Sequence, residues 1–191
     1  YGLDQFGKLF TDRQLVALNT FSDLVKDAQL KATADAKAAG WEDDGKPLCE
    51  GGTGATAYGD ALAVYLTLSV SRWADFENSI CCWNAINENV RVLFARQAIP
   101  MSWDFAEVNP YGCVGNIMNC VENAAASFEN LAPNAKGSAQ QDDATTQNIS
   151  KCKVISTDPP YYDNIGYADL SDFFYMWIRR GLKEVLPNLF V

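Results

Sequence analysis

Two consecutive prolines, Pro159 and Pro160, constrain the fold of this chain more than any other feature of its sequence. They follow a short run with an apolar centre, residues 151–157, and the carboxylate of Asp158. A residue before proline is held in extended geometry, and proline has no amide hydrogen to give to a β-ladder. The pattern therefore predicts a short strand over residues 151–157 that ends at a stiff corner.

The segment after this corner has the pattern of a helix. Residues 170–185 contain the run FFYMWI, which predicts a helix buried on several sides. A strand, a corner and a helix in this order form half of a βαβ unit, and ligands of open α/β sheets bind beyond the carboxyl ends of the strands. We therefore expect an α/β fold with a ligand at the corner.

The first 150 residues are predominantly helical by their pattern. Helical spacing of apolar residues predicts helices over residues 11–40, 56–77, 88–98 and 116–131. Thr11 and Gln14 form a capping-box pattern at the start of the first helix, and Gly40 is expected to end it. Residues 134–150 are small, polar and without a period, which predicts a mobile loop.

Composition and charge limit the classes of function. The chain has 191 residues, of which 48% are hydrophobic and 20% charged, as is typical of a soluble globular domain. A net charge of −9 predicts repulsion from phosphate backbones and anionic membranes, so a nucleic acid would need basic surface from elsewhere. Because the chain begins at Tyr1 without a leader, we expect a piece of a longer cytoplasmic protein.

The cysteines and tryptophans favour structural roles. Six cysteines stand at positions 49, 81, 82, 113, 120 and 152, without a CxxC pair, and the chain has no histidine. Zinc sites usually need closer cysteine spacing and histidine, so we expect reduced, mostly buried thiols and no metal. A position in or near the core is expected for Trp41, Trp73, Trp83 and Trp177.

The corner carries the groups needed to hold a planar amine. The Asp158 carboxylate and the Pro159 carbonyl can accept both hydrogens of an exocyclic NH₂ group, while the ring of Tyr161 stacks on its face. Holding the amine in this way fixes the direction of its lone pair, so rate acceleration comes mainly from alignment with an electrophile. No histidine base is required.

The tetrapeptide DPPY at positions 158–161 matches the [D/N/S]-P-P-[Y/F/W] signature of amino-group methyltransferases. The chain resembles a family of large prokaryotic adenine-specific DNA methylases in three blocks. These blocks are GKLFTDRQLVALNTFSDLV (7–25), FARQAIPMSWDFAEVNP (94–110) and TDPPYYDNIGYADLSDFFYMWIRR (157–180). The resemblance implies methyl transfer from S-adenosylmethionine to the N6 amine of adenine in DNA, as in DNA methylation and restriction-modification.

The resemblance also implies roles for the residues of the tetrapeptide. Asp158 and the carbonyl of Pro159 would accept hydrogen bonds from the target amine, and Pro160 would stiffen the corner. Tyr161 would stack on the base, which must first be flipped out of duplex DNA. The implied fold is a partial Rossmann-like methyltransferase with a large, mostly helical insertion over residues 1–150. Residues 151–191 would contribute the motif and the following helix.

Enzymes of this kind bind the methyl donor at a glycine loop of the type F-x-G-x-G that follows a first strand, and this chain has no such unit. The nearest segment is CEGGTGATAYGD, in which Gly51, Gly52 and Gly54 precede a helix. An acidic segment, not an apolar strand, comes before it, which favours a glycine-rich helix start over a cofactor site. The site for S-adenosylmethionine is therefore expected upstream of Tyr1, and the isolated chain is expected to be inactive.

Several alternatives remain open at this stage. The chain is alternatively an inactive helical interaction module derived from a methylase, and the same corner also serves cytosine N4 amines or RNA. Asp104 and Glu107 are candidate substrate contacts, against an irregular loop anchored by a tryptophan. Four arginines are candidate phosphate contacts, against solvated or ion-paired side chains: Arg91, Arg96, Arg179 and Arg180.

Overall fold

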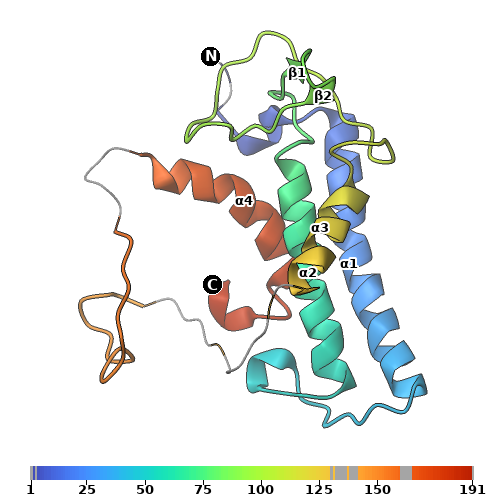
Figure 1. Cartoon of the computed structure of the whole chain (residues 1–191), viewed down its shortest axis with the longest axis vertical. Coiled ribbons are helices and arrows are strands. Elements are labelled where there is room, and N and C mark those ends of the chain that lie inside the picture. The colour runs from blue at the N-terminus through green and yellow to red at the C-terminus, as the bar shows by residue number, and fades with distance from the viewer. Residues whose placement is uncertain are drawn as a thin grey trace.

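The computed structural model describes residues 2, 4–129, 131, 137, 142–159 and 165–190. Helices dominate this part of the chain: α1 (Asp12–Ala38), α2 (Ala55–Ala74), α3 (Ile117–Glu129) and α4 (Tyr167–Leu182). Short 3-10 helices cover Phe6–Leu9 (η1), Leu48–Glu50 (η2) and Pro187–Leu189 (η3). Two short strands, β1 (Trp83–Asn84) and β2 (Asn89–Val90), pair antiparallel. α1 and α2 lie side by side in opposite directions, and α3 and α4 pack on α2 (Figure 1).

α1 begins and ends where its sequence predicts. The Thr11 hydroxyl accepts a hydrogen bond from the Gln14 amide at 3.3 Å, and the Gln14 side chain accepts one from the Thr11 amide at 2.8 Å. Gly40 has a φ of +84°, a conformation that glycine adopts without steric cost and that stops the helix. The helices predicted over 11–40, 56–77, 116–131 and 170–185 are all confirmed, with ends that differ by a few residues.

An aromatic cluster joins the two ends of the chain. Its members are Phe10, Phe94, Phe173, Phe174 and Trp177. The ring of Phe10 stacks on Phe173 at 5.6 Å between centroids and meets the edge of Trp177 at 5.5 Å. Phe94 lies 5.1 Å from both Phe173 and Phe174. Aromatic pairs of this geometry contribute roughly 0.5–1.5 kcal/mol beyond the area they bury, so the cluster is a main source of attachment for α4.

The helix predicted over residues 88–98 is wrong. After β2 the chain forms turns, because its amides bond to a distant partner instead of to carbonyls four residues earlier. The Leu93 amide donates to the main-chain oxygen of Asp75 at 2.8 Å, and the Phe94 amide donates to the Asp75 carboxylate at 3.0 Å. Asp75 is buried at the end of α2, where it ties this segment to the helix.

The strand predicted over residues 151–157 is also wrong. Residues 149–153 form turns and a bend, residues 154–159 have no regular structure, and all of residues 151–159 are exposed. A strand needs the edge of another strand for its hydrogen bonds, and no described residue supplies one here. This segment lies apart from the helices in Figure 1. The parallel sheet of the expected α/β fold is therefore not among the described residues, and the fold class and the boundary at residue 150 remain predictions.

The predicted loop over residues 134–150 is described only in part. Residues 134–136 and 138–141 lie outside the described residues. The described remainder contains a turn in which the Asp143 carboxylate accepts hydrogen bonds from the amide and hydroxyl of Thr145, at 2.8 and 2.7 Å. These bonds lower the pKa of Asp143.

The expected burial of cysteines and tryptophans is only half right. All six cysteines are free, but only Cys81 and Cys120 are buried, so the expectation of mostly buried thiols is wrong. Trp73 and Trp177 are buried as expected, at 0% and 4% exposure. The other two tryptophans placed in or near the core, Trp41 and Trp83, are exposed.

Gly181 marks the closest approach of α4 to α2. A Cβ atom at this position would lie 2.3 Å from the Thr67 hydroxyl and 2.7 Å from its methyl carbon. Thr67 is 2% exposed and β-branched, so its side chain has little freedom to move aside. The α2–α4 contact therefore requires a glycine here.

We expect Gly181→Ala to lower the free energy of unfolding by about 1–3 kcal/mol, because the added methyl group overpacks this contact. Urea denaturation of the chain measures the change. Thr67→Ala removes the two closest atoms, so the double variant should recover most of the loss. Equal urea midpoints for the wild type and Gly181→Ala would show that α2 and α4 move apart to accommodate the methyl group without loss of stability.

Candidate functional site

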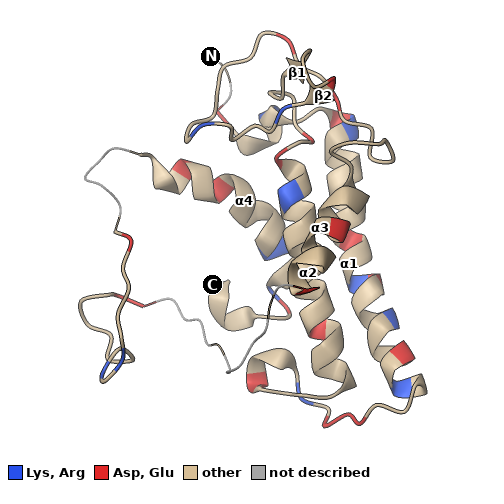
Figure 2. Cartoon of the chain, viewed as in Figure 1, with Lys and Arg blue, Asp and Glu red and all other residues tan. Residues whose placement is uncertain are grey.

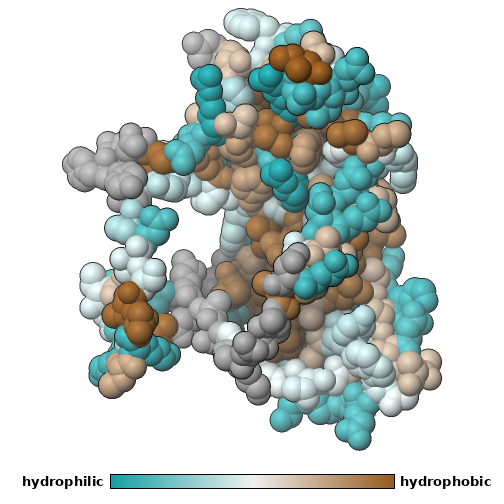
Figure 3. All heavy atoms as spheres, in the orientation of Figure 1, coloured by the Kyte–Doolittle hydropathy of each residue, from teal (hydrophilic) through white to brown (hydrophobic). Residues whose placement is uncertain are grey.

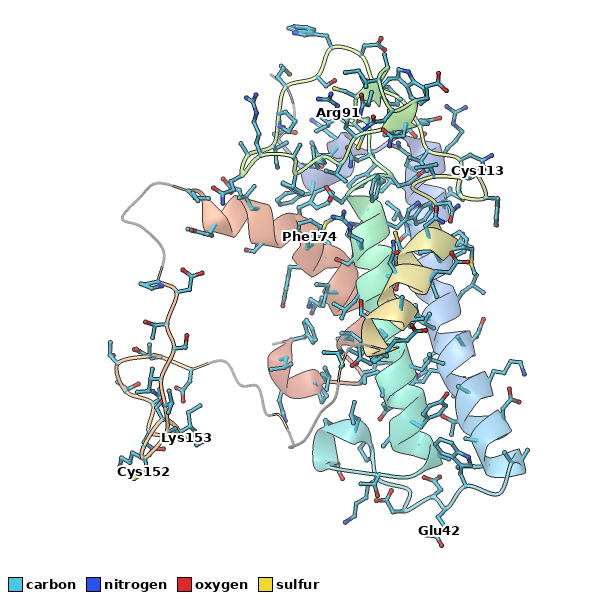
Figure 4. The ribbon with its side chains drawn as sticks, in the orientation of Figure 1. Glu42, Arg91, Cys113, Cys152, Lys153 and Phe174 are labelled. Carbon is cyan, nitrogen blue, oxygen red and sulfur yellow. The ribbon has the colours of Figure 1, made fainter. Side chains whose placement is uncertain are left out.

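The structure places the first two residues of the DPPY tetrapeptide on an exposed segment. Asp158 and Pro159 are both exposed, and Asp158 makes no hydrogen bond or ion pair with any described residue. Pro160 and Tyr161 lie outside the described residues. Figure 4 shows the same segment, with Cys152 and Lys153 labelled, away from the helices. The Asp158 carboxylate is thus accessible to a ligand.

α4 begins shortly after the tetrapeptide and is firmly attached to the other helices. Phe173, Trp177 and Leu182 form its buried face, while Tyr175 is 39% exposed on the opposite side. The sequence predicts that this helix is buried on several sides, whereas the structure buries one wide apolar face. Because this face packs on α2 and on the aromatic cluster, it fixes the position of α4, which begins at Tyr167.

The three blocks that resemble the methylase family meet in space. Phe10 of the first block and Phe94 of the second both contact Phe173 of the third. The first and second blocks are also joined by Glu107, whose carboxylate accepts hydrogen bonds from the Thr11 hydroxyl at 3.0 Å and from Arg13 at 2.7 Å. Segments separated by more than 40 residues in the sequence thus form one continuous unit around Phe173 of α4.

The acids of the second block have different environments. Glu107 is already bonded to Thr11 and Arg13, which favours a structural role over contact with a substrate. Asp104 is exposed. The alternative of a loop anchored by its tryptophan is wrong, because Trp103 is 92% exposed. The loop is held instead by Val108, which is buried, and by the Ala106 amide, which donates to the main-chain oxygen of Cys81 at 2.9 Å.

The glycine-rich segment before α2 is used for packing. A Cβ atom on Gly52 would lie 2.1 Å from the carbonyl oxygen of Lys46, and one on Gly54 would lie 2.6 Å from the Cα of Asp43. Both glycines thus allow the loop after α1 to cross close to the start of α2. These contacts favour the glycine-rich helix start over a cofactor site.

The N-terminus of α2 is already occupied by a carboxylate of the chain. Asp43 accepts hydrogen bonds from the amide and the hydroxyl of Thr56, at 3.0 and 2.8 Å, and pairs with Lys37 at 2.8 Å. The bond to Lys37, followed by those to Thr56, holds the pKa of Asp43 well below its usual range. The Thr56 amide bonds to Asp43 and the Ala55 amide to the main-chain oxygen of Glu42, so this helix N-terminus has fewer amides to offer to a phosphate or a carboxylate ligand.

The four candidate arginines are all exposed, and one of them is paired. Arg180 donates to Asp23 of α1 at 2.7 Å. Within the described part of the chain, the side chains of Arg91, Arg96 and Arg179 have neither an ion pair nor a hydrogen bond. Arg91 lies just after β2 (Figure 4). Three of the four thus fit the solvated alternative and remain available to an anion.

One perturbed carboxylate was not predicted. Glu77 is 3% exposed, and its Oε2 atom has no hydrogen-bond partner among the described residues. Burial, with a smaller effect of the Glu107 charge, raises the pKa of Glu77 to about 7. The only sequence signal is an acid directly after an apolar helix, which is also what a helix end looks like. The effect of the Glu107 charge places Glu77 near the second block.

The buried thiols are not candidates for nucleophiles. Burial, assisted by the nearby Asp75 charge, raises the pKa of Cys81 to about 12. Burial also raises the pKa of Cys120. Since the thiolate is the reactive form, both cysteines are inert at neutral pH.

One cavity of the described structure is lined by neither Asp158 nor Pro159. It has a volume of about 740 Å³ between α2 and α3, and its lining includes Tyr65, Arg72, Phe76 and Phe128. A smaller cavity of about 250 Å³ lies between α1 and α4. The described residues contain no cluster of three potential metal ligands, and none of their helices has the length and apolarity to span a bilayer.

Comparison of the chain with protein-family models, with curated proteins and with solved structures finds no match. A functional assignment for this chain therefore depends on its own residues and their arrangement.

We expect Glu77→Gln to change how stability depends on pH. The pKa of Glu77 rises from its ordinary value of 4.5 to about 7 on folding, so the folded state binds this proton more tightly than the unfolded chain. The stabilisation is complete below pH 4.5 and is lost as the pH rises through about 7. Up to about 3 kcal/mol is involved, by the free energy of a pKa shift of this size.

Urea denaturation at several pH values between 4 and 8 measures this effect. The variant cannot ionise at residue 77, so its stability relative to the wild type should increase as the pH rises. Glu122→Gln, at an exposed position on α3, is the matched control and should show no such trend. A difference in stability between the wild type and Glu77→Gln that is constant with pH would contradict the raised pKa of Glu77.

Proposed function

We propose that this chain supplies the target-amine corner of an S-adenosylmethionine-dependent methyltransferase that acts on the N6 amine of adenine in DNA. The observation that carries the proposal is the DPPY tetrapeptide, whose Asp158 is exposed and unpaired in the described structure. The meeting of the three blocks around the aromatic cluster supports it further, because residues that share a function need a common scaffold.

The proposed mechanism assigns binding and orientation to the corner. The Asp158 carboxylate and the Pro159 carbonyl would accept the two N6 hydrogens, Pro160 would keep the corner stiff, and Tyr161 would stack on the extrahelical adenine. S-adenosylmethionine, when bound, supplies an electrophilic methyl group. The carboxylate would also stabilise the positive charge that develops on N6 as the new bond forms. Alignment of the lone pair is the main contribution of these residues.

The proposed architecture is a partial Rossmann-like methyltransferase of the α/β class. Residues 1–150 would be its mostly helical insertion, and residues 151–191 would bring the motif and α4 to the catalytic core. The donor site would come from another part of the protein, since Gly52, Gly54 and Asp43 are already used at the start of α2. A cytoplasmic enzyme of DNA methylation is the corresponding cellular assignment.

In the full-length protein we expect Asp158→Ala to abolish adenine methylation, with at least about a hundredfold loss of rate, because a charged acceptor is removed from the amine. Asp158→Asn should retain part of the activity, since its amide oxygen still accepts. Transfer of a labelled methyl group to DNA, with separation of the product nucleosides, is the measurement. It also distinguishes N6-methyladenine from N4-methylcytosine, and an RNA substrate tests the remaining alternative.

The matched control is Asp172→Ala, which removes an exposed carboxylate from α4. It should leave both methylation and the melting temperature unchanged. Asp158 has no partner in the described structure, so its removal should not affect folding either. Normal methylation by Asp158→Ala would rule out the proposed mechanism.

A second candidate is an inactive interaction module, which is favoured by the net charge of −9 and by the occupied N-terminus of α2. Titration calorimetry with S-adenosylmethionine, on the chain and on the full-length protein, separates the two. We expect binding by the full-length protein only, because the donor site is assigned to another part of it. Absence of binding by both would favour the interaction module.

A further inference from the structure

We propose that Trp103 stacks on an unpaired nucleobase of the DNA substrate and thereby holds the strand beside the target adenine. This inference rests on the proposed function, since it names a contact of the same substrate. Trp103 is 92% exposed, whereas the other tryptophans range from 0% to 56%. A tryptophan side chain with this much exposed apolar surface in the free protein is typical of a surface that binds a partner.

The loop that carries Trp103 is anchored on both sides. The Ser102 hydroxyl donates to the main-chain oxygen of Asp104 at 2.6 Å and lies 3.3 Å from the Cys82 sulfur. On the other side, the Ala106 amide donates to the main-chain oxygen of Cys81 at 2.9 Å. The indole is thus presented on a short tip whose ends are fixed, which lowers the entropy lost when a base stacks on it.

The surroundings of Trp103 fit a nucleic acid. Met101 and Phe105 are 44% and 41% exposed on either side of it, and Ile86 between β1 and β2 is 88% exposed. Figure 3 shows a strongly apolar group at the end of the molecule that carries β1 and β2. Arg91 and Arg96, which belong to the same region of the chain, have free guanidinium groups. Stacking of bases on aromatic side chains is one way in which proteins hold single-stranded DNA.

The loop is also connected to the motif helix. Phe94 contacts Phe173 and Phe174 of α4, and Ile99 packs against the same core. The residues that lead to Trp103 are therefore attached to α4 by packing. Figure 4 labels Phe174 on α4. A reaction on an extrahelical adenine leaves an opened strand beside the enzyme, and Trp103 offers it a stacking partner.

Charge contributes little to the proposed contact. Glu88 and Asp104 are exposed in the same region and offset the two free arginines. We therefore expect stacking to carry the affinity, with only a weak dependence on salt from this loop.

The test uses the full-length protein and fluorescence anisotropy of an end-labelled adenine-containing DNA, either single-stranded or as a duplex with one unpaired adenine. Trp103→Ala should raise the Kd about 5- to 100-fold, the range expected for the loss of one stacked base, without changing its salt dependence. Trp103→Phe should retain most of the affinity. The matched control is Trp41→Ala, which removes a half-exposed indole that packs on Tyr58 at the far end of α1.

Two results would overturn the inference. One is an unchanged Kd for Trp103→Ala. The other is a lowered melting temperature with a normal Kd, which would show that Trp103 packs against another part of the protein. Methylation by Asp158→Ala tests the proposed function separately. Loss of DNA affinity by Trp103→Ala in a protein that methylates nothing would support the stacking role and reject the enzyme.

Discussion

The contact of Phe10 with Phe173 and Trp177 is the interaction on which the arrangement of this chain depends. Phe10 is 7% exposed and lies between η1 and the capping box of α1. Its ring packs against α4. A helix of 16 residues is marginal in water by itself, and residues 151–159, which precede α4 in the sequence, are exposed. Burial of its aromatic face is therefore what keeps α4 folded. This contact therefore sets where α4 lies relative to α1 and to the loop of Phe94.

The parts of the fold that the sequence predicts correctly are those with local causes. Thr11 and Gln14 bond to each other three residues apart, and Gly40 ends α1 through its own backbone conformation. The helical spacing of apolar residues in α2, α3 and α4 works for the same reason, because each helix buries one face against a neighbour. For the candidate site, the sequence predicts a corner over residues 158–161, of which the structure describes only Asp158 and Pro159, so the corner stays a prediction.

The errors come from partners that are distant in the sequence. Residues 88–98 have helical spacing, but the amides of Leu93 and Phe94 bond to Asp75, almost 20 residues away. Residues 151–157 have the composition of a strand, but a strand exists only where another edge accepts its hydrogen bonds. The burial of a side chain also depends on partners that are distant in the sequence. Trp73 is 0% exposed and Trp103 is 92% exposed, although the two side chains are chemically identical. The pKa of Glu77 could not be predicted either, because it depends on a burial that only the packed structure reveals.

The acidic character of the chain is compatible with DNA contact at one end. Glu42, Asp43, Asp44 and Glu50 lie in the loop after α1 and around η2, and Figure 2 shows acidic residues both in this loop and beside the strands. α1 has 27 residues and is therefore about 40 Å long at 1.5 Å per residue. The Debye length at physiological salt is about 8 Å, so these distant acids are screened from a ligand at the loop of Trp103. If DNA binds as proposed, the net charge limits how much of the surface it can approach, and the exposed indole of Trp103 determines where it stacks.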